Sequence, residues 1–178
     1  MENQVVHIYS TVRPELKKRV LLYGTAYAAL GALLVLISGL FLPPFWMQYF
    51  GFPLLIIGIL VIAWGLMPYK RVTRLETQPH ELVVTDDQNL HYAVSGQHVL
   101  TVPLQAIERL SFCDENVDRY GIALDLKSGM SELVALKKPG TSVVSYLASM
   151  RRRYACDLFF PYFSQRSYRE LTGSIELQ

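Results

Sequence analysis

Two long stretches without a charged side chain constrain this chain of 178 residues more than any other feature. Residues 20 to 42 and residues 49 to 67 contain no Asp, Glu, Lys, Arg or His. About 20 apolar residues are enough for a helix to cross the hydrocarbon core of a bilayer, whereas helices of a globular core keep a polar face. Neither stretch has such a face, so we expect two transmembrane helices and not a buried helical hairpin. The first stretch is also longer than the apolar region of a cleavable signal peptide.

The segment between the two stretches, FLPPFWMQYFGFP at residues 41 to 53, predicts a turn. Pro43 and Pro44 cannot continue a helix interior, so the first helix should end at Leu42. Pro53 then falls within the first turn or so of the second helix, where its missing N–H costs little. The aromatic residues of this segment suit the headgroup level on the non-cytoplasmic side of a membrane.

Lysine and arginine residues gather at the outer ends of both stretches. Because such residues are retained on the cytoplasmic side, they predict a hairpin with both termini in the cytoplasm. Residues 1–80 carry a net charge of +4 and residues 81–178 a net charge of −2. The basic character thus belongs to the membrane flanks, which disfavours a nucleic-acid-binding domain. The membrane-flanking basic residues are Arg13, Lys17, Lys18, Arg19, Lys70, Arg71 and Arg74.

Small residues recur along both stretches at a spacing of about seven, and small residues let helix backbones approach closely in a membrane. Such a seam serves a tight intramolecular hairpin or a homo-oligomer equally well. Neither stretch contains an ionisable residue, which disfavours a channel or transporter acting alone. The helix-packing glycines are Gly24, Gly31, Gly51, Gly58 and Gly65.

After Arg74 the pattern changes to short runs rich in β-branched, leucine or aromatic residues, separated by turn residues. The runs predict an antiparallel meander of about six or seven strands. After Gly140, apolar residues recur at three- and four-residue steps as far as Leu158, which predicts one amphipathic helix capped by Thr141 or Ser142. The runs are residues 81–86, 89–95, 98–104, 106–114, 120–128 and 131–138.

The predicted fold class is therefore an α+β membrane protein. An N-terminal two-helix transmembrane hairpin is followed by a small antiparallel β-barrel or sandwich, which a C-terminal amphipathic helix caps. The predicted segments are a basic N-terminal segment at 1–19, the hairpin at 20–68 with spans at 20–42 and 49–67, a basic juxtamembrane linker at 69–80, a cytoplasmic domain at 81–158 and an aromatic C-terminal tail at 159–178.

This layout resembles a known family. The segments ELVVTDDQNLHYAV, VPLQAIERLSF, GIALDLKSG and SVVSYLASMRRRYA, placed after a membrane hairpin, look like those of bacterial membrane proteins with a cytoplasmic pleckstrin-homology-like (PH-like) domain. The resemblance covers residues 20–156 in layout. It implies a PH-like fold, a place in the bacterial inner membrane and a scaffold role, with no catalytic residue. It does not imply a phosphoinositide pocket, because residues 81–100 contain no Lys or Arg.

Candidate chemical groups in the second half of the chain are few. Cys113 and Cys156 form no CxxC pattern and are interpreted as ordinary thiols. His91 and His98 could come within diagonal reach on one face of a hairpin, but no third ligand for zinc stands nearby. The acidic turn at residues 112–118 lacks the spacing of a calcium loop and is interpreted as solvated. We therefore expect no metal and no cofactor.

Two surface features are candidate contacts for a partner or for lipid. Three successive arginines fan around the predicted helix, so at least two should face solvent or a partner, and near the inner leaflet each would contribute about 1 kcal/mol with anionic lipid. The aromatic cluster of the tail is too large to stay in water. It could cover the domain, lie on the membrane or insert into a partner. The candidate contact residues are Arg151, Arg152, Arg153, Phe159, Phe160, Tyr162 and Phe163.

The sequence contains no recognisable pair of nucleophile and base and no phosphate-binding loop, which argues against an enzyme. We expect a non-enzymatic inner-membrane protein, an accessory, scaffold or assembly subunit that binds a protein partner through its cytoplasmic domain. The alternative is a module that responds to anionic lipid, and an enzyme acting on a membrane substrate would need a concave polar pocket. Membrane lipids, a protein partner and, through the glycine seam, a second copy of the chain are the predicted partners; nucleic acid is not.

Overall fold

The computed structural model describes residues 5–137 and 142–176. Its contacts divide the chain into two compact units. One is a helical unit, Pro14–Arg74, and the other is a folded domain formed by Met1–Arg13 together with Leu75–Gln178. Long apolar helices and antiparallel sheets together confirm the predicted α+β class. The predicted cap Thr141 and the ends of the predicted 131–138 strand, N-terminal segment and C-terminal tail lie outside the described residues.

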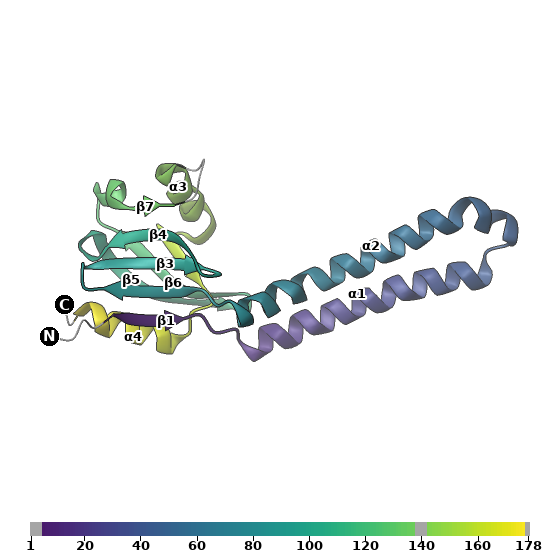
Figure 1. Ribbon diagram of the computed structural model, residues 1–178, viewed down its shortest axis with the longest axis horizontal. Helices are drawn as coiled ribbons and strands as arrows, with labels where there is room; N and C mark the ends of the chain where they lie inside the picture. The colour runs from purple at the N-terminus through teal and green to yellow at the C-terminus, as the bar shows by residue number, and fades with distance from the viewer. Residues whose placement is uncertain (1–4, 138–141, 177–178) are drawn as a thin grey trace. The chain divides into compact units, whose positions relative to one another are not determined.

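The helical unit is an antiparallel pair of helices, α1 (Pro14–Phe41) and α2 (Pro44–Thr77), joined by a tight turn (Figure 1). Both helices are long and apolar enough to cross a membrane. Only 11% of the most apolar window of each helix is buried, whereas a helix in the core of a globular protein would be mostly buried. The low burial therefore favours insertion into a membrane over a soluble helical core.

The turn between the helices is shorter than the sequence predicts. It consists of Leu42 and Pro43, because α2 begins at Pro44. A proline is well tolerated at the first helical position, where its N–H would have no partner. The prediction that Pro53 opens the second helix is therefore wrong, since Pro53 lies inside α2. The prediction of a linker at 69–80 is also wrong, because α2 extends through most of it.

Four glycines form the contact between α1 and α2. A Cβ atom added to Gly24 would lie 3.1 Å from the carbonyl oxygen of Gly65, and one added to Gly31 would lie 2.8 Å from the carbonyl oxygen of Gly58. All four glycines are buried. Helix backbones this close leave no room for a side chain, so the seam lies inside the hairpin. Gly51 meets only a side chain of its own helix and does not contribute to the seam.

The folded domain contains two antiparallel sheets, with strand orders β1-β2-β3-β4-β7 and β5-β6-β8 (Figure 1). Among the described residues no strand pairing joins the two sheets, so they do not close into a barrel, which is one of the two forms predicted. The strands are β1 (Val6–Tyr9), β2 (Glu81–Thr85), β3 (Asn89–Val94), β4 (Gln97–Pro103), β5 (Ile107–Asn116), β6 (Arg119–Leu126), β7 (Ala135–Leu136) and β8 (Leu158–Pro161).

Two α-helices complete the domain, α3 (Val143–Tyr154) and α4 (Gln165–Glu176). Short 3₁₀ helices at Leu104–Ala106 (η1) and Met130–Leu133 (η2) connect strands. The hydroxyl of Ser142 accepts a hydrogen bond from the N–H of Ser145, which confirms the N-cap. The prediction that this helix continues to Leu158 is wrong, because Ala155 adopts a left-handed conformation and ends it.

The predicted tail is part of the core. Its residues form β8, which pairs with β6, and α4, which contacts β1 and β5. Phe160, Phe163 and Leu171 are each at most 1% exposed and pack with the apolar faces of both sheets. The prediction of a separate tail at 159–178 is therefore wrong, and of the three placements considered for its aromatic cluster the structure has the first, covering the domain.

Residues 6–9 and 14–19 of the predicted N-terminal segment belong to folded elements, β1 and α1. Strand β1 pairs with β2, with His7 opposite Val83. Because β1 precedes the helical unit and β2 follows it, the helical unit is an insertion between two neighbouring strands of one sheet. Both ends of the hairpin are consequently attached to the same folded domain.

Candidate functional site

A pocket of about 290 Å³ lies in the folded domain where the β5–β6 turn, the end of α3 and β8 meet. It combines basic and aromatic side chains. Three of the seven predicted contact residues, Arg153, Phe159 and Tyr162, are brought together here, although they come from different elements. The pocket is lined by Asp118, Arg119, Arg153, Tyr154, Phe159, Pro161 and Tyr162.

Arg119 holds the wall of the pocket together. Its guanidinium lies 5.0 Å from the ring centroid of Tyr154, pairs with Glu115 at 2.8 Å and donates to the carbonyl oxygen of Arg153 at 2.7 Å. Its Nε atom is buried and has no hydrogen-bond partner among residues 5–137 and 142–176. A buried donor without an acceptor costs about 1–3 kcal/mol, so Arg119 holds the wall of the pocket at some cost in stability.

Arg153 supplies a second cation at the same pocket. Its guanidinium is 5.8 Å from the ring centroid of Tyr154, and the Tyr154 ring is stacked on the ring of Phe159 with centroids 4.4 Å apart. Arg153 is exposed, and no carboxylate pairs with it in the part of the chain that the structure describes. The pocket can therefore accept an anionic group against Arg153 and an apolar group against the aromatic rings.

Two left-handed residues shape the backbone around this pocket. Ala155 (φ 54°) turns the chain from α3 toward β8, and Tyr162 (φ 68°) turns it from β8 toward α4. A non-glycine residue in this region needs support from its surroundings. For Tyr162 that support includes its N–H, which donates to the carbonyl oxygen of Tyr120 at 2.9 Å, and its carbonyl oxygen, which accepts from the N–H of Thr11 at 2.8 Å.

The three successive arginines do not form one patch. Arg151 pairs through its Nε with Asp157, whose other carboxylate oxygen accepts the N–H of Leu126 at 2.8 Å. Asp157 is 7% exposed, so this pair fixes the turn between α3 and β8. Arg152 is exposed and does not line the pocket. Only Arg153 of the three reaches it.

Phe160 and Phe163 were predicted as contacts, but they lie in the core and offer no surface to a partner. Arg119 and Tyr154 were missed. Their sequence neighbourhoods look like an ordinary turn and a helix end, and only the pairing of β6 with β8 brings them to the same place. The closeness in sequence of Arg153, Tyr154 and Phe159 was a signal for part of the pocket. It did not indicate that β6 would add Arg119 to the same pocket.

A strap of residues 10–13 ties the start of α1 to the same region of the domain. The side chain of Arg13 binds Asp114 through two hydrogen bonds of 2.7 and 2.8 Å and lies 4.2 Å above the ring of Tyr120. Arg13 also lowers the pKa of the Asp114 carboxyl. Arg13, one of the residues predicted to flank the membrane, is thus paired with an acidic residue of the domain. Lys17, Lys18, Arg19, Lys70, Arg71 and Arg74 are exposed on α1 and α2.

We predict that Tyr120→Phe loosens this strap. The Tyr120 hydroxyl donates to the carbonyl oxygen of Thr11 at 2.8 Å and accepts the N–H of Arg13 at 3.0 Å. Because Tyr120 is 1% exposed, loss of its hydroxyl should cost about 1–3 kcal/mol of domain stability. Amide hydrogen exchange of the full chain should accelerate at residues 11–13. Tyr168→Phe is the control, because the Tyr168 hydroxyl donates to the carbonyl oxygen of Leu110 and not to the strap. Unchanged exchange at residues 11–13 in Tyr120→Phe would refute the role of the strap.

The other candidate groups take the following positions. His91 and His98 come together as predicted, with Nδ1 and Nε2 2.8 Å apart and the Thr101 hydroxyl beside both. Burial, His91 and Lys137 lower the pKa of His98. No group of three or more His, Cys, Asp or Glu residues that could hold a metal occurs in the described ranges.

The two cysteines are free thiols. Burial raises the pKa of Cys156 to about 11, so this thiol stays protonated at neutral pH. Burial also raises the pKa of Cys113. In the acidic turn, Asp114 and Glu115 are each paired with an arginine, Arg13 and Arg119. No protein-family model, curated protein or solved structure matches the chain.

Proposed function

We propose that this chain is a non-enzymatic integral protein of the bacterial inner membrane, an accessory, scaffold or assembly subunit whose cytoplasmic domain binds an acidic segment of a protein partner. The PH-like relationship of the domain is part of this proposal, supported by two antiparallel sheets that share a core with α3. No chemical step is assigned to any residue.

The insertion of the hairpin between β1 and β2 supports the topology in this proposal. One folded domain cannot lie on both sides of a bilayer, so two paired strands on either side of the hairpin require both hairpin ends on one side. Two spans satisfy this requirement. The exposed lysines and arginines at these ends favour the cytoplasmic side.

The pocket around Arg153 is the observation that carries the binding function. A carboxylate from a partner would meet a guanidinium that forms no ion pair among the described residues, beside a stacked pair of aromatic rings. Arginine and tyrosine are the residue types that dominate binding energy at protein interfaces. Arg151 is occupied by Asp157, so a diffuse attraction to anionic lipid has fewer cations available than the sequence suggests.

We predict that Arg153→Glu abolishes partner capture while Arg152→Glu does not. Both substitutions change the charge equally on adjacent exposed residues, but only Arg153 lines the pocket. A photo-crosslinking amino acid at Asp118, on the pocket wall, would be activated in native membranes containing the full chain. Loss of a charge-assisted contact should reduce the crosslinked band at least tenfold, from about 1.5–3 kcal/mol.

Equal capture by both variants, or equal loss in both, would contradict the proposed pocket. Equal loss would indicate a general charge effect, and the lipid-responsive alternative would then be tested by flotation of the full chain variants with vesicles of increasing anionic lipid content and salt. A partner band that neither variant changes would place the contact elsewhere on the domain.

A further inference from the structure

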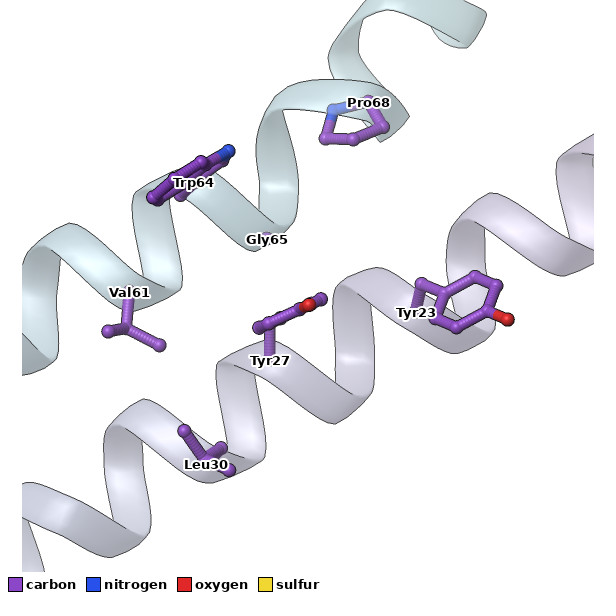
Figure 2. A pocket seen from close by; sticks show the side chains of 7 residues that line it. All are labelled: Tyr23, Tyr27, Leu30, Val61, Trp64, Gly65 and Pro68. Carbon is purple, nitrogen blue, oxygen red and sulfur yellow. The ribbon is translucent and has the colours of Figure 1, made fainter.

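The two membrane helices enclose an apolar groove of about 370 Å³ near the end of the hairpin where the chain enters and leaves it (Figure 2). Tyr23, Tyr27 and Leu30 line it from α1, and Val61, Trp64 and Pro68 line it from α2. The volume is within the range of about 300–1,000 Å³ usual for ligand pockets. The groove is a laterally open feature of the hairpin surface, so in a bilayer it has to be filled.

The glycine seam creates this groove. Gly65 has no side chain, so the Cβ atom of Tyr27 lies directly against its backbone. Figure 2 shows the Tyr27 ring between the two helices, opposite Gly65, with the Trp64 ring on the α2 side. Tyr27 is 54% exposed and Trp64 is 78% exposed, which leaves both aromatic faces available to a neighbour.

Unpaired polar groups stand at the same place. The hydroxyls of Tyr23 and Tyr27 make no hydrogen bond within residues 5–137 and 142–176. Pro68 lies inside α2 and has no N–H, so the carbonyl group of Trp64, four residues earlier, lacks its helical donor. Polar groups at membrane depth require partners. An occupant of this groove therefore needs hydrogen-bonding groups as well as an apolar part.

The net charge around the groove is positive. The helical unit contains six Lys and Arg residues against one acidic residue, Glu15, and all of them lie at the end of the hairpin where the groove is found. The guanidinium of Arg19 is 5.8 Å from the ring centroid of Tyr23, which lines the groove. Lys70 follows Pro68 by two residues. A cationic rim above an apolar groove complements a negatively charged headgroup above a hydrocarbon chain.

We propose that this groove binds one anionic phospholipid. An acyl chain lies between Tyr27, Leu30, Val61 and Trp64. The phosphate accepts a hydrogen bond from the Tyr23 hydroxyl and forms an ion pair with the guanidinium of Arg19. The inference rests on the proposed function only in requiring that the hairpin be inserted in a bilayer; it is independent of the Arg153 pocket.

The two tryptophans of the chain allow a direct test. Trp46 and Trp64 are the only tryptophans, so Trp46→Phe leaves Trp64 as the single fluorophore at the groove. The full-length variant would be reconstituted in phosphatidylcholine bilayers containing a low fraction of brominated phosphatidylglycerol or of brominated phosphatidylcholine. We expect the apparent affinity measured by quenching to be about fivefold higher for the anionic lipid.

Three further variants locate the preference. In Trp64→Phe the single fluorophore is Trp46, which lies near the turn at the other end of the hairpin. The two brominated lipids should quench the emission of Trp46 equally. Arg19→Gln should reduce the preference at Trp64, because it removes the rim charge. Val61→Phe should abolish the preference by filling the groove, while some quenching by both lipids remains.

The outcomes separate the site from the membrane anchor. Equal quenching of Trp64 by both lipids would overturn the lipid site and leave the anchor intact. Quenching of Trp46 but not of Trp64 would mean that a second copy of the hairpin covers the groove, which also overturns the lipid site. No quenching of either tryptophan would overturn the membrane anchor itself.

Discussion

Gly31→Leu should separate α1 and α2. A Cβ atom at Gly31 would lie 2.8 Å from the carbonyl oxygen of Gly58 and 2.7 Å from Cγ1 of Ile62. The backbone oxygen cannot rotate away as a side chain can, so the helices must move apart. Overpacking typically costs about 1–3 kcal/mol, and we expect the upper end of that range here. Denaturant unfolding in micelles of full chains that also carry Trp46→Phe, followed by the emission of Trp64, measures the loss.

Gly39→Leu is the matched control for this prediction. It adds the same side chain to the same helix at a glycine with no other atom within 4 Å of the added Cβ. Its unfolding should resemble that of the parent chain. If the two leucine variants were equally stable, the close contact between Gly31 and Gly58 would not exist in the membrane-inserted protein.

Phe160→Ala should unfold the domain or leave it barely stable. Phe160 is 1% exposed, lies on β8 opposite Ile122 and contacts the ring of Tyr92 at a centroid distance of 4.9 Å. Truncating a buried phenylalanine to alanine costs about 3–5 kcal/mol, which is a large part of the about 5–15 kcal/mol by which most domains are stable. Near-ultraviolet circular dichroism of the full chain during urea unfolding would measure this loss.

Leu133→Ala is the control for the core position. Leu133 is also a large apolar residue of the domain, but its side chain is 54% exposed, so its truncation should change the midpoint little. Similar midpoints for Phe160→Ala and Leu133→Ala would mean that Phe160 belongs to a tail outside the core, as the predicted tail at 159–178 requires. The same reasoning predicts that a chain ending at Asp157 does not form a folded domain, because it lacks β8 and α4.

The secondary structure between residues 81 and 126 follows from local sequence. Five strands there, β2 to β6, begin and end within three residues of the predicted runs. Turn residues such as Ser95 and Gly96 separate them, and both have positive φ, a conformation that short polar residues and glycine reach most easily. Burial alternates along β2 because one face of the strand packs on the core, and this alternation is the pattern that predicts a strand.

The ends of the folded domain could not be predicted in this way. Strand β1 has four residues and β8 also has four, which is too short for a clear alternation, and each is stabilised by a distant strand. Of the apolar residues of β8, Leu158 fits the helix pattern, and Phe159 and Phe160 resemble the start of a separate tail. Their strand conformation depends on pairing with β6, 38 residues earlier in the register of Phe160 with Ile122, and such pairing leaves no local trace.

The candidate site also has one part that the sequence predicts and another that depends on the fold. That Arg153 is exposed follows from its place on a helix that buries Leu147 on its other side, and the sequence predicted at least two exposed arginines. That Arg151 is neutralised by Asp157, and that Arg119 and Phe159 stand beside Arg153, depends on the turn at Ala155. A contact between side chains of different elements requires the fold before it can be stated.

What the sequence by itself determined is the presence of two long apolar helices and of an antiparallel β-rich domain, because apolar length and strand periodicity are properties of neighbouring residues. The tertiary structure alone decided that the helices interrupt one sheet, that the aromatic end of the chain is core, and that Arg153 lines a pocket. These features are pairings between residues far apart in the chain, and their free energy exists only when the whole domain is folded.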